Sequence, residues 1–427
     1  MDYDIICNIG DLMRLISRIH KWLMGLDLWI LIPYFLLCTI GVIMVYSASS
    51  NIGNPTNYLI KQTIFALLGF AALVAFSHFN LKKMTNKYFI IISLVAFAIA
   101  LLYLKFFGQT INGAAGWFTF AGISLQPSEF AKLFFVIYMA CEITKHQQRL
   151  FGASTDEIWG SRSWLRAFQH RNYHLQKWIL SMAPQLLVAT VFIFLIFIQP
   201  DLGGAVINAM IVVIMLMASG ILNPKRIAEV GITGLVVITG ILLVWIGPKV
   251  AQPNSEQNYQ IKRITAVLHP FRYSQGIGKQ LVNSFYAMSN GSIFGVGLGN
   301  SVEKTGYLPE PNTDFIMAVV AEELGLVAIL VILVLIAILV SKIVVVGIRD
   351  NDIYYSLICF GVATYIMIET TFNIGGVIGI LPITGVTFPF ISYGGSSIVT
   401  LSSGVGMALN VARTQRQRKF EIQLKKA

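Results

Sequence analysis

The feature that most constrains this chain is a series of apolar runs, each about as long as a membrane is thick. The run from 28 to 47, for example, contains no charged residue. Backbone groups in hydrocarbon cannot bond to water, so only helices or a closed barrel can span a membrane. Barrel strands alternate over roughly ten residues, whereas these runs are continuous over roughly 20. The runs therefore predict membrane-spanning helices.

Ten such runs predict an all-α polytopic membrane protein with ten transmembrane helices. The composition agrees, because 56% of the residues are hydrophobic and only 12% are charged, whereas soluble domains are about a quarter charged. The mean hydropathy is +0.71. The predicted spans are 28–47, 59–77, 88–107, 127–144, 178–198, 202–221, 228–247, 314–341, 353–372 and 391–411.

The basic residues predict the orientation of these helices. Short cytoplasmic segments of membrane proteins are enriched in Lys and Arg, and the loops 48–58, 108–126 and 373–390 contain none. Both termini are therefore expected in the cytoplasm, with a large extracellular loop, 248–313, between helices 7 and 8. The net charge of +11 then indicates a membrane rather than nucleic acid as the partner. Of 31 Lys and Arg residues, 22 lie in the expected cytoplasmic segments 1–27, 78–87, 145–177, 222–227, 342–352 and 412–427.

Three regions follow from this topology. Residues 1–27 form a cytoplasmic amphipathic segment, in which "LMRLISRIHKWL" has one apolar helical face, as in helices that lie in a membrane surface. Residues 28–411 form the ten-helix transmembrane domain. Residues 412–427 form a basic cytoplasmic tail, which suits anionic lipid.

The stretch "YLPEPNTDFIMAVVAEELG", residues 307–325, places four carboxylates at and inside a membrane boundary. Asp314 lies where the polar loop meets the eighth predicted span. It can cap the helix, because Asp accepts hydrogen bonds from free N–H groups at a helix start. It can also act as a base that takes a proton from a sugar hydroxyl. Both interpretations remain open at this point.

Two charged residues inside the fourth predicted span form a second candidate. Glu129 and Lys132 in "QPSEFAKL" are three residues apart, so they share a helical face and can pair. Charges in hydrocarbon are costly and usually face a cavity or each other. The pair is therefore either a structural network or part of a substrate site, where Lys132 can hold a lipid phosphate.

The Gly- and Pro-rich segment 373–397, "NIGGVIGILPITGVTFPFISYGGSS", lies between two predicted spans. Irregular backbone at membrane depth is tolerated only when it is buried in protein or lines a cavity. The segment is therefore expected either to pack as a re-entrant loop or to form a wall of a substrate cavity.

Four motifs together resemble one family. "GWFTFAGISLQPSEFAKL", "QPDLGG", "YLPEPNTDFIMAVVAEELG" and "GILPITGVTFPFISYGGSS" occur in order along the chain and look like the SEDS family (shape, elongation, division and sporulation), which contains FtsW and RodA. The sequence "GVTFPFISYGGSS" is more similar to the division type, FtsW, than to the elongation type, RodA.

The resemblance implies a ten-span peptidoglycan glycosyltransferase of the bacterial cytoplasmic membrane, at the division septum. Its substrates would be lipid II and a glycan linked to undecaprenyl pyrophosphate, and its partner a class B penicillin-binding protein, a transpeptidase. Asp314 matches the family's catalytic aspartate, and Trp117 a functionally important tryptophan of the second outside loop.

The leaving pyrophosphate requires positive charge. Lys262, Arg263, Arg272 and Lys304 in the large loop can supply it, and so can a divalent cation such as Mg²⁺ or Mn²⁺; no other cofactor is expected. Other functions remain open: an elongation-type RodA-like polymerase, a lipid II flippase and a non-enzymatic division scaffold.

Overall fold

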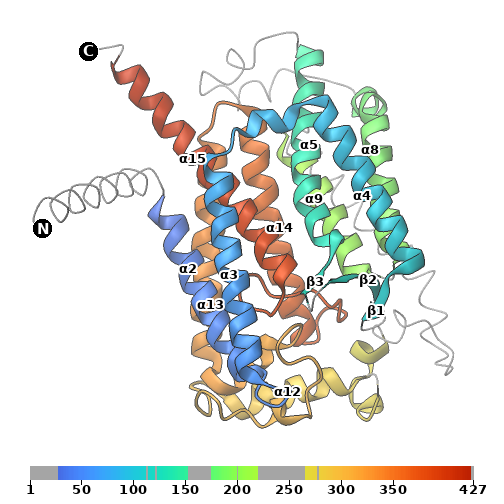
Figure 1. The fold of residues 1–427 in the computed structure, drawn as a ribbon, viewed down its shortest axis with the longest axis vertical. Helices are drawn as coiled ribbons and strands as arrows, with labels where there is room; N and C mark the ends of the chain where they lie inside the picture. The colour runs from blue at the N-terminus through green and yellow to red at the C-terminus, as the bar shows by residue number, and fades with distance from the viewer. Residues whose placement is uncertain are drawn as a thin grey trace, which may run out of the picture.

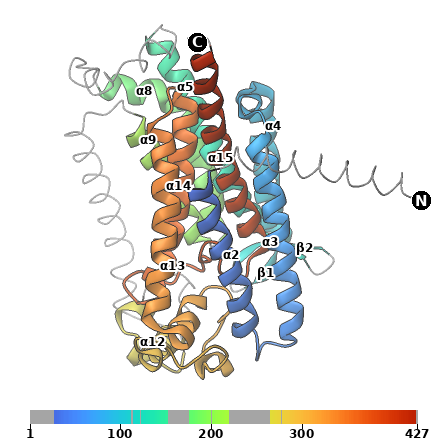
Figure 2. The ribbon, with the colours of Figure 1, turned by 90° about the vertical axis from the view of Figure 1, so that its left-hand side faces the viewer.

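The computed structural model describes residues 27–111, 114–120, 123–151, 175–199, 201–219, 265–276 and 278–424. Long helices run side by side, with a small sheet and the short helix α12 at one end (Figures 1 and 2). The long helices are α2 (Leu28–Ala48), α3 (Pro55–His78), α4 (Lys87–Phe107), α5 (Pro127–Phe151), α8 (Leu175–Ile198), α9 (Leu202–Ala218), α13 (Ile316–Ile348), α14 (Ile353–Val377) and α15 (Gly395–Leu424). The shorter ones are η1 (Leu81–Thr85), η2 (Phe271–Tyr273), α12 (Lys279–Gly291) and η3 (Glu303–Thr305).

The helices coincide with the predicted spans. In the described part of the chain, nine of the ten predicted ranges are occupied by a long helix, and the tenth, 228–247, lies outside the described residues. Six of the described helices are long and apolar enough to cross a membrane, and α8 and α9 contain shorter apolar stretches. The prediction of a helical, multi-pass membrane protein is therefore confirmed, whereas the count of ten stays a prediction.

The helices differ in how much of their surface is exposed, according to their position in the bundle. The helices α14 and α15 lie inside the bundle and are buried over most of their membrane length. The helix α4 lies at the edge (Figure 1) and exposes Tyr88, Ile92 and Phe106 by 74%, 67% and 75%. Large exposed apolar patches are unusual on soluble proteins. On a helix as apolar as α4, this face is suited to lipid.

The helix α13 is broken at Gly325, which has φ 76° and ψ −177°. A break frees backbone groups that hydrocarbon cannot satisfy. The segment 292–297 supplies the partners: Val296 N donates to the Glu322 carbonyl at 2.9 Å, and Leu326 N donates to the Ser292 carbonyl at 3.1 Å. The break therefore joins α13 to the loop that follows α12.

Gly325→Ala should destabilise the protein strongly. The backbone at this residue lies in a region that is essentially restricted to glycine. An added Cβ would also lie within 2.5 Å of the Gly295 nitrogen and closer still to the Ile293 carbonyl oxygen. We expect a loss of more than about 3 kcal/mol of unfolding free energy from strain and overpacking together. Thermal unfolding in detergent measures it.

Gly53→Ala is the matched control for this prediction. Gly53 also has a positive φ, 119°, but an added Cβ there meets no atom within 4 Å. Only backbone strain of about 1–3 kcal/mol is then expected. Equal destabilisation by the two substitutions would show that the contact between α13 and the segment 292–297 is unimportant.

A three-stranded antiparallel sheet, not predicted from the sequence, lies between α4 and α5. Its strands, in spatial order, are β1 (Gln109–Ile111), β2 (Ala114–Phe120) and β3 (Ile123–Leu125). The all-α prediction is wrong in this detail. Aromatic and β-branched residues favour strands, and the Asn-Gly dipeptide between β1 and β2 in the sequence favours hairpins. The sequence therefore contained a signal for this sheet.

Ion pairs at the opposite end of the bundle join the two ends of the described chain. Asp27 lies 3.0 Å from Arg416 and 3.3 Å from Lys342, and Asp350 lies 3.3 Å from Arg418. The helix α15 continues through these contacts to Leu424, so residues 412–424 of the predicted tail are helical, and the boundary at 411 stays a prediction. The amphipathic segment lies outside the described residues except for Asp27.

Candidate active site

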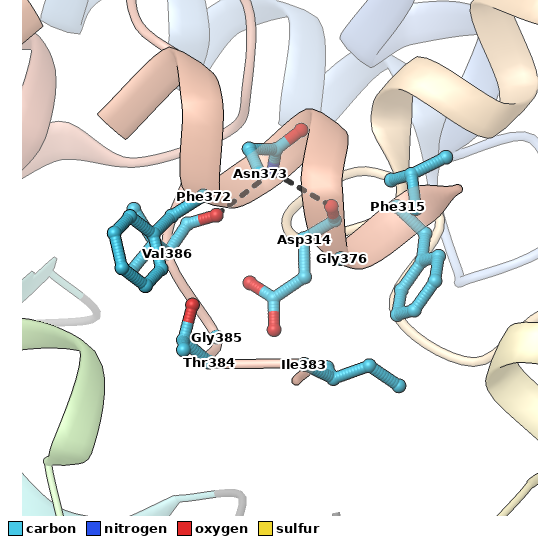
Figure 3. A pocket seen from close by; sticks show the side chains of 10 residues that line it. Asp314, Phe315, Phe372, Asn373, Gly376, Ile383, Thr384, Gly385 and Val386 are labelled. Carbon is cyan, nitrogen blue, oxygen red and sulfur yellow. Dashed lines mark hydrogen bonds between the residues drawn. The ribbon is translucent and has the colours of Figure 1, made fainter. Parts of the chain in front are cut away.

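Asp314 lies directly before α13, in a narrow recess. The N-cap of α13 is Phe315, whose side chain makes no capping bond, so Asp314 precedes the cap position. Figure 3 shows its carboxylate directed away from Asn373 and toward the segment 383–385. The recess has a volume of about 10 Å³, room for roughly one water molecule. It is lined by Asp314, Phe315, Phe372, Asn373, Gly376, Val377, Ile383, Thr384, Gly385 and Val386.

The backbone around Asp314 is fixed by hydrogen bonds from other segments. The Asn373 amide donates to the carbonyls of both Asp314 and Val386, each at 2.8 Å (Figure 3). The Ser392 hydroxyl donates to the Thr313 carbonyl at 2.7 Å, and Tyr393 N donates to the Asn312 carbonyl at 2.8 Å. Asn373 is buried, and buried bonds of this kind hold a catalytic group in one geometry.

The Gly- and Pro-rich segment packs into the bundle and also lines the recess, whereas its role as a wall of a substrate cavity stays a prediction. Residues 383–386 line the recess. Phe388, Phe390 and Ile391 are buried in the bundle, where Phe390 packs edge-on against Tyr34 at 5.4 Å between ring centroids. Protein rather than lipid therefore surrounds the irregular backbone, as membrane depth requires.

Two neighbouring glutamates of α13 organise the loop that leads to Asp314. Glu322 accepts hydrogen bonds from the Ser301 hydroxyl and from the backbone N–H groups of Val302, at 3.1 Å, and Glu303, at 3.3 Å. Glu323 pairs with Lys304 at 2.6 Å. Both glutamates are fully buried. Charges buried in this way must be paired or hydrogen-bonded, so these two are structural.

Lys304, a predicted ligand of pyrophosphate, is largely engaged within the protein. It is only 3% exposed, and its ammonium also donates to the Ser47 hydroxyl at 3.0 Å. Ser47 in turn donates to Glu323. Its role toward a substrate stays a prediction. Two further predicted ligands, Lys262 and Arg263, lie outside the described residues.

The predicted pair of Glu129 and Lys132 forms, and the structure adds two partners. The Lys132 ammonium lies 2.7 Å from Glu129 and 2.6 Å from Glu369 of α14. The Tyr365 hydroxyl donates to the other oxygen of Glu129 at 3.0 Å. One ammonium therefore serves two carboxylates in the bundle interior. Helical spacing could find Glu129, but Glu369 is distant in sequence and only its charge within a span marks it.

Trp117 lies in the sheet rather than in the recess. It is half-buried in β2, paired in register with Gln109 of β1. The next residue, Phe118, stacks on Tyr103 of α4 at 5.7 Å, which ties the sheet to the end of the bundle. The Trp117 ring is thus held on a structured element, although it does not line the recess around Asp314.

Trp117→Ala should impair activity more than Trp117→Phe. An amphipathic ring at the membrane boundary can pack against lipid or sugar, and Phe keeps an aromatic face that Ala removes. We expect the Ala variant to lose about tenfold in rate, as for a contact of about 1.5 kcal/mol. Initial rates of the reaction that the family resemblance implies, polymerisation of lipid II, measure the difference. Near-native rates in both variants would reduce Trp117 to a membrane anchor.

Comparison with known proteins identifies the family. Residues 28–417 match the family model FTSW_RODA_SPOVE, described as a cell cycle protein. The chain belongs to this family. It is 34% identical over 402 residues to the probable peptidoglycan glycosyltransferase FtsW of Bacillus subtilis, covering 92% of each chain. It is 32% identical over 395 residues to stage V sporulation protein E of the same species, covering 91% of this chain and 98% of the relative.

Solved structures show the same fold as this FtsW/RodA/SpoVE family member. A chain from "Structural coordination of polymerization and crosslinking by a peptidoglycan synthase complex" aligns with a TM-score of 0.67 at 22% identity, over 92% of this chain and 99% of that one. The rod shape determining protein RodA of Thermus thermophilus aligns with a TM-score of 0.59 at 20% identity, over 91% and 97%. At these identities the likeness concerns the fold alone.

Proposed function

We propose that this protein polymerises lipid II into glycan strands at the outer face of the bacterial cytoplasmic membrane, with Asp314 as the general base. The glycosyltransferase activity follows from the family, whose curated relatives are named probable peptidoglycan glycosyltransferases. The observation that supports Asp314 is its place: a half-buried carboxylate in a recess, on backbone fixed by Asn373.

The proposed reaction is a direct displacement. The 4-hydroxyl of an N-acetylglucosamine residue of lipid II attacks the anomeric carbon of the donor glycan. Asp314 accepts the hydroxyl proton as the new C–O bond forms. The bond from the anomeric carbon to pyrophosphate breaks, and undecaprenyl pyrophosphate leaves with the electron pair. Because the donor is α-linked and the polymer β-linked, one displacement with inversion accounts for the product.

The proposal places ten helices in the membrane with both termini in the cytoplasm and Asp314 outside. The distribution of Lys and Arg supports this orientation. The helix positions also support it. The start of α13, which follows Asp314, lies at the end of the bundle near α12, whereas the C-terminal part of α15, which carries Arg416, lies at the other end (Figures 1 and 2). Residues 28–411 then form the transmembrane domain and 248–313 the large outer loop.

The leaving pyrophosphate would be stabilised by cations. The proposed ones are Lys262, Arg263 and Arg272, with Lys304 as a further candidate in the same outer loop. Mg²⁺ or Mn²⁺ is the alternative. Among the described residues no group of three or more His, Cys, Asp or Glu side chains is placed to hold a metal, and no step is assigned to one.

The proposed setting is septal wall synthesis with a class B penicillin-binding protein. Several relatives at 34% to 31% identity carry the name FtsW, which favours the division type over a RodA-like elongation type. A structural relative comes from a study of a peptidoglycan synthase complex that couples polymerization and crosslinking. A transpeptidase partner is consistent with that relative.

One experiment separates the polymerase from a flippase or a scaffold. The purified chain, alone and with its transpeptidase, is incubated with lipid II, and the glycan strands are resolved by electrophoresis. Polymerisation that is lost in Asp314→Asn supports the proposal. Movement of lipid II across vesicles without polymerisation would instead support a flippase, and neither activity would support a scaffold.

A further inference from the structure

A second, larger cavity adjoins the segment that carries Asp314. Its volume is about 360 Å³, within the range of roughly 300–1,000 Å³ that is usual for small-molecule sites. Its wall includes the residues just before Asp314, from Leu308 to Thr313, but shares no residue with the recess around Asp314. The remaining wall comes from the loop between α2 and α3, from the start of α3, and from the lining residues Lys304, Gly306 and Tyr393. One short segment therefore borders both hollows.

The lining of this cavity combines aromatic rings with hydrogen-bonding groups. Tyr58 and Tyr393 pack edge to face, with 5.2 Å between ring centroids and an interplanar angle of 73°. Both are half-buried. Glu310, Asn312 and Asn51 add a carboxylate and two amides. A pyranose ring has apolar C–H faces and a rim of hydroxyls, so it needs this mixture of flat apolar surface and a few polar groups.

The charge of the cavity favours a neutral ligand. Lys304 lines the cavity, but it is buried and its ammonium is neutralised by Glu323 at 2.6 Å. Glu310 then adds a carboxylate, which disfavours a phosphate or pyrophosphate through like-charge repulsion. The tyrosine hydroxyls of the cavity are hydrogen-bonding groups that add no charge at neutral pH.

Glu310 occupies a strained backbone position. Its φ is 51°, which is uncommon for a residue other than glycine and costs about 1–3 kcal/mol. Such strain persists where the surroundings fix it, often at ligand clamps. The Glu310 carbonyl accepts from the backbone N–H groups of Phe315 at 3.3 Å and Thr313 at 3.4 Å. Glu310 thus lines the cavity, and its backbone carbonyl is bonded to the residues on either side of Asp314.

We propose that this cavity binds a sugar residue of the growing β-linked glycan strand, between Tyr58, Tyr393 and Glu310. The inference rests on the proposed polymerase function and adds a place where the strand stays attached between additions. A strand held beside the segment 308–313 remains close to Asp314, so the cavity favours long strands.

Calorimetric titration of the purified full-length chain with chitotetraose tests the binding directly. This β-1,4-linked tetramer of N-acetylglucosamine has neither lipid nor pyrophosphate. We expect Tyr58→Ala and Glu310→Gln each to weaken its binding about fivefold to tenfold, as for the loss of one aromatic or charged hydrogen-bonding contact. Glu310→Gln keeps the side-chain shape, so it remains informative if Tyr58→Ala folds poorly. No measurable binding by the wild-type chain would overturn the proposal.

Two control variants make the result specific. Tyr307→Ala removes a tyrosine of the same loop that is 57% exposed and does not line the cavity, and it should bind the probe as the wild type does. Asp314→Asn should also bind normally while it fails to polymerise. Equal affinity in Tyr58→Ala, Glu310→Gln and Tyr307→Ala would exclude this cavity as the binding site.

Strand length provides the second measurement. Tyr58→Ala should make shorter glycan strands from lipid II than Tyr307→Ala does. If the wild-type chain makes no strands, the proposed function fails, but the titration still decides whether the cavity binds sugar. Normal strand length together with normal affinity in Tyr58→Ala would refute the cavity alone.

Discussion

Asp314→Asn should abolish the polymerisation of lipid II while leaving the protein folded. Asparagine has nearly the shape of aspartate but cannot accept a proton at neutral pH, and general-base catalysis typically contributes about 10²–10⁴-fold in rate. The bond from Asn373 reaches the backbone carbonyl of residue 314 rather than its side chain, so the substitution preserves it. Initial rates with labelled lipid II, and thermal unfolding of the same sample, measure the two effects. Asp314→Ala should be equally inactive.

Asp352→Asn is the matched control. Asp352 caps α14 through Tyr354 N at 3.1 Å and pairs with Lys82 at 3.2 Å, away from the recess. Asparagine also caps helices well, so little change in rate or stability is expected. Near-native turnover in Asp314→Asn would instead assign Asp314 a structural role at the start of α13.

The features that the sequence could predict are those that depend on near neighbours along the chain. The run Leu28–Ala48 contains no charge, so its length predicts a span. Glu129 and Lys132 are three residues apart on a helix, so their contact follows from helical geometry. Asp314 was found through its motif and its place at a boundary, and the structure puts it in a recess.

The features that the sequence could not predict depend on contacts between segments that are distant along the chain. Gly325 breaks α13 within a continuous apolar run, and the partners of the break come from 292–297. The hydropathy of the run does not predict such a break, because the residues on both sides of Gly325 are mostly apolar. The sequence places Lys304 in a polar loop, where it can supply charge to a pyrophosphate, but its ammonium lies 2.6 Å from the Glu323 carboxylate. Neither pairing has a local periodicity, so only the folded arrangement reveals which charges are already satisfied.

Lys132→Met should be the most destabilising change in the charged network of the bundle interior. Lys132 is 2% exposed and is the ammonium that Glu129 and Glu369 share. Its removal leaves two buried carboxylates without a positive charge, and breaking a buried pair costs about 3–5 kcal/mol. Lys145→Met is the control, because Lys145 and Glu142 form a pair of the same spacing in α5 at 3.0 Å, with Lys145 32% exposed. That loss should stay below about 1 kcal/mol. Thermal unfolding in detergent compares them.

The third partner decides which rescue experiment is informative. If Lys132 paired with Glu129 alone, combining Glu129→Gln with Lys132→Met would leave no lone charge. Lys132 also pairs with Glu369, so in this double variant Glu369 would remain buried without its positive partner. Glu369→Gln must therefore be added, so that no lone charge is left. If Lys132 is structural, the triple variant should regain both stability and polymerisation. If Lys132 holds a lipid phosphate, stability should return while the apparent affinity for lipid II stays weak. We expect the first result, because the Lys132 ammonium is 2% exposed and already shared by two carboxylates, and a carboxylate disfavours a phosphate beside it. Weak apparent affinity for lipid II in a stable triple variant would instead assign Lys132 to the phosphate, for which a compact ammonium is suited.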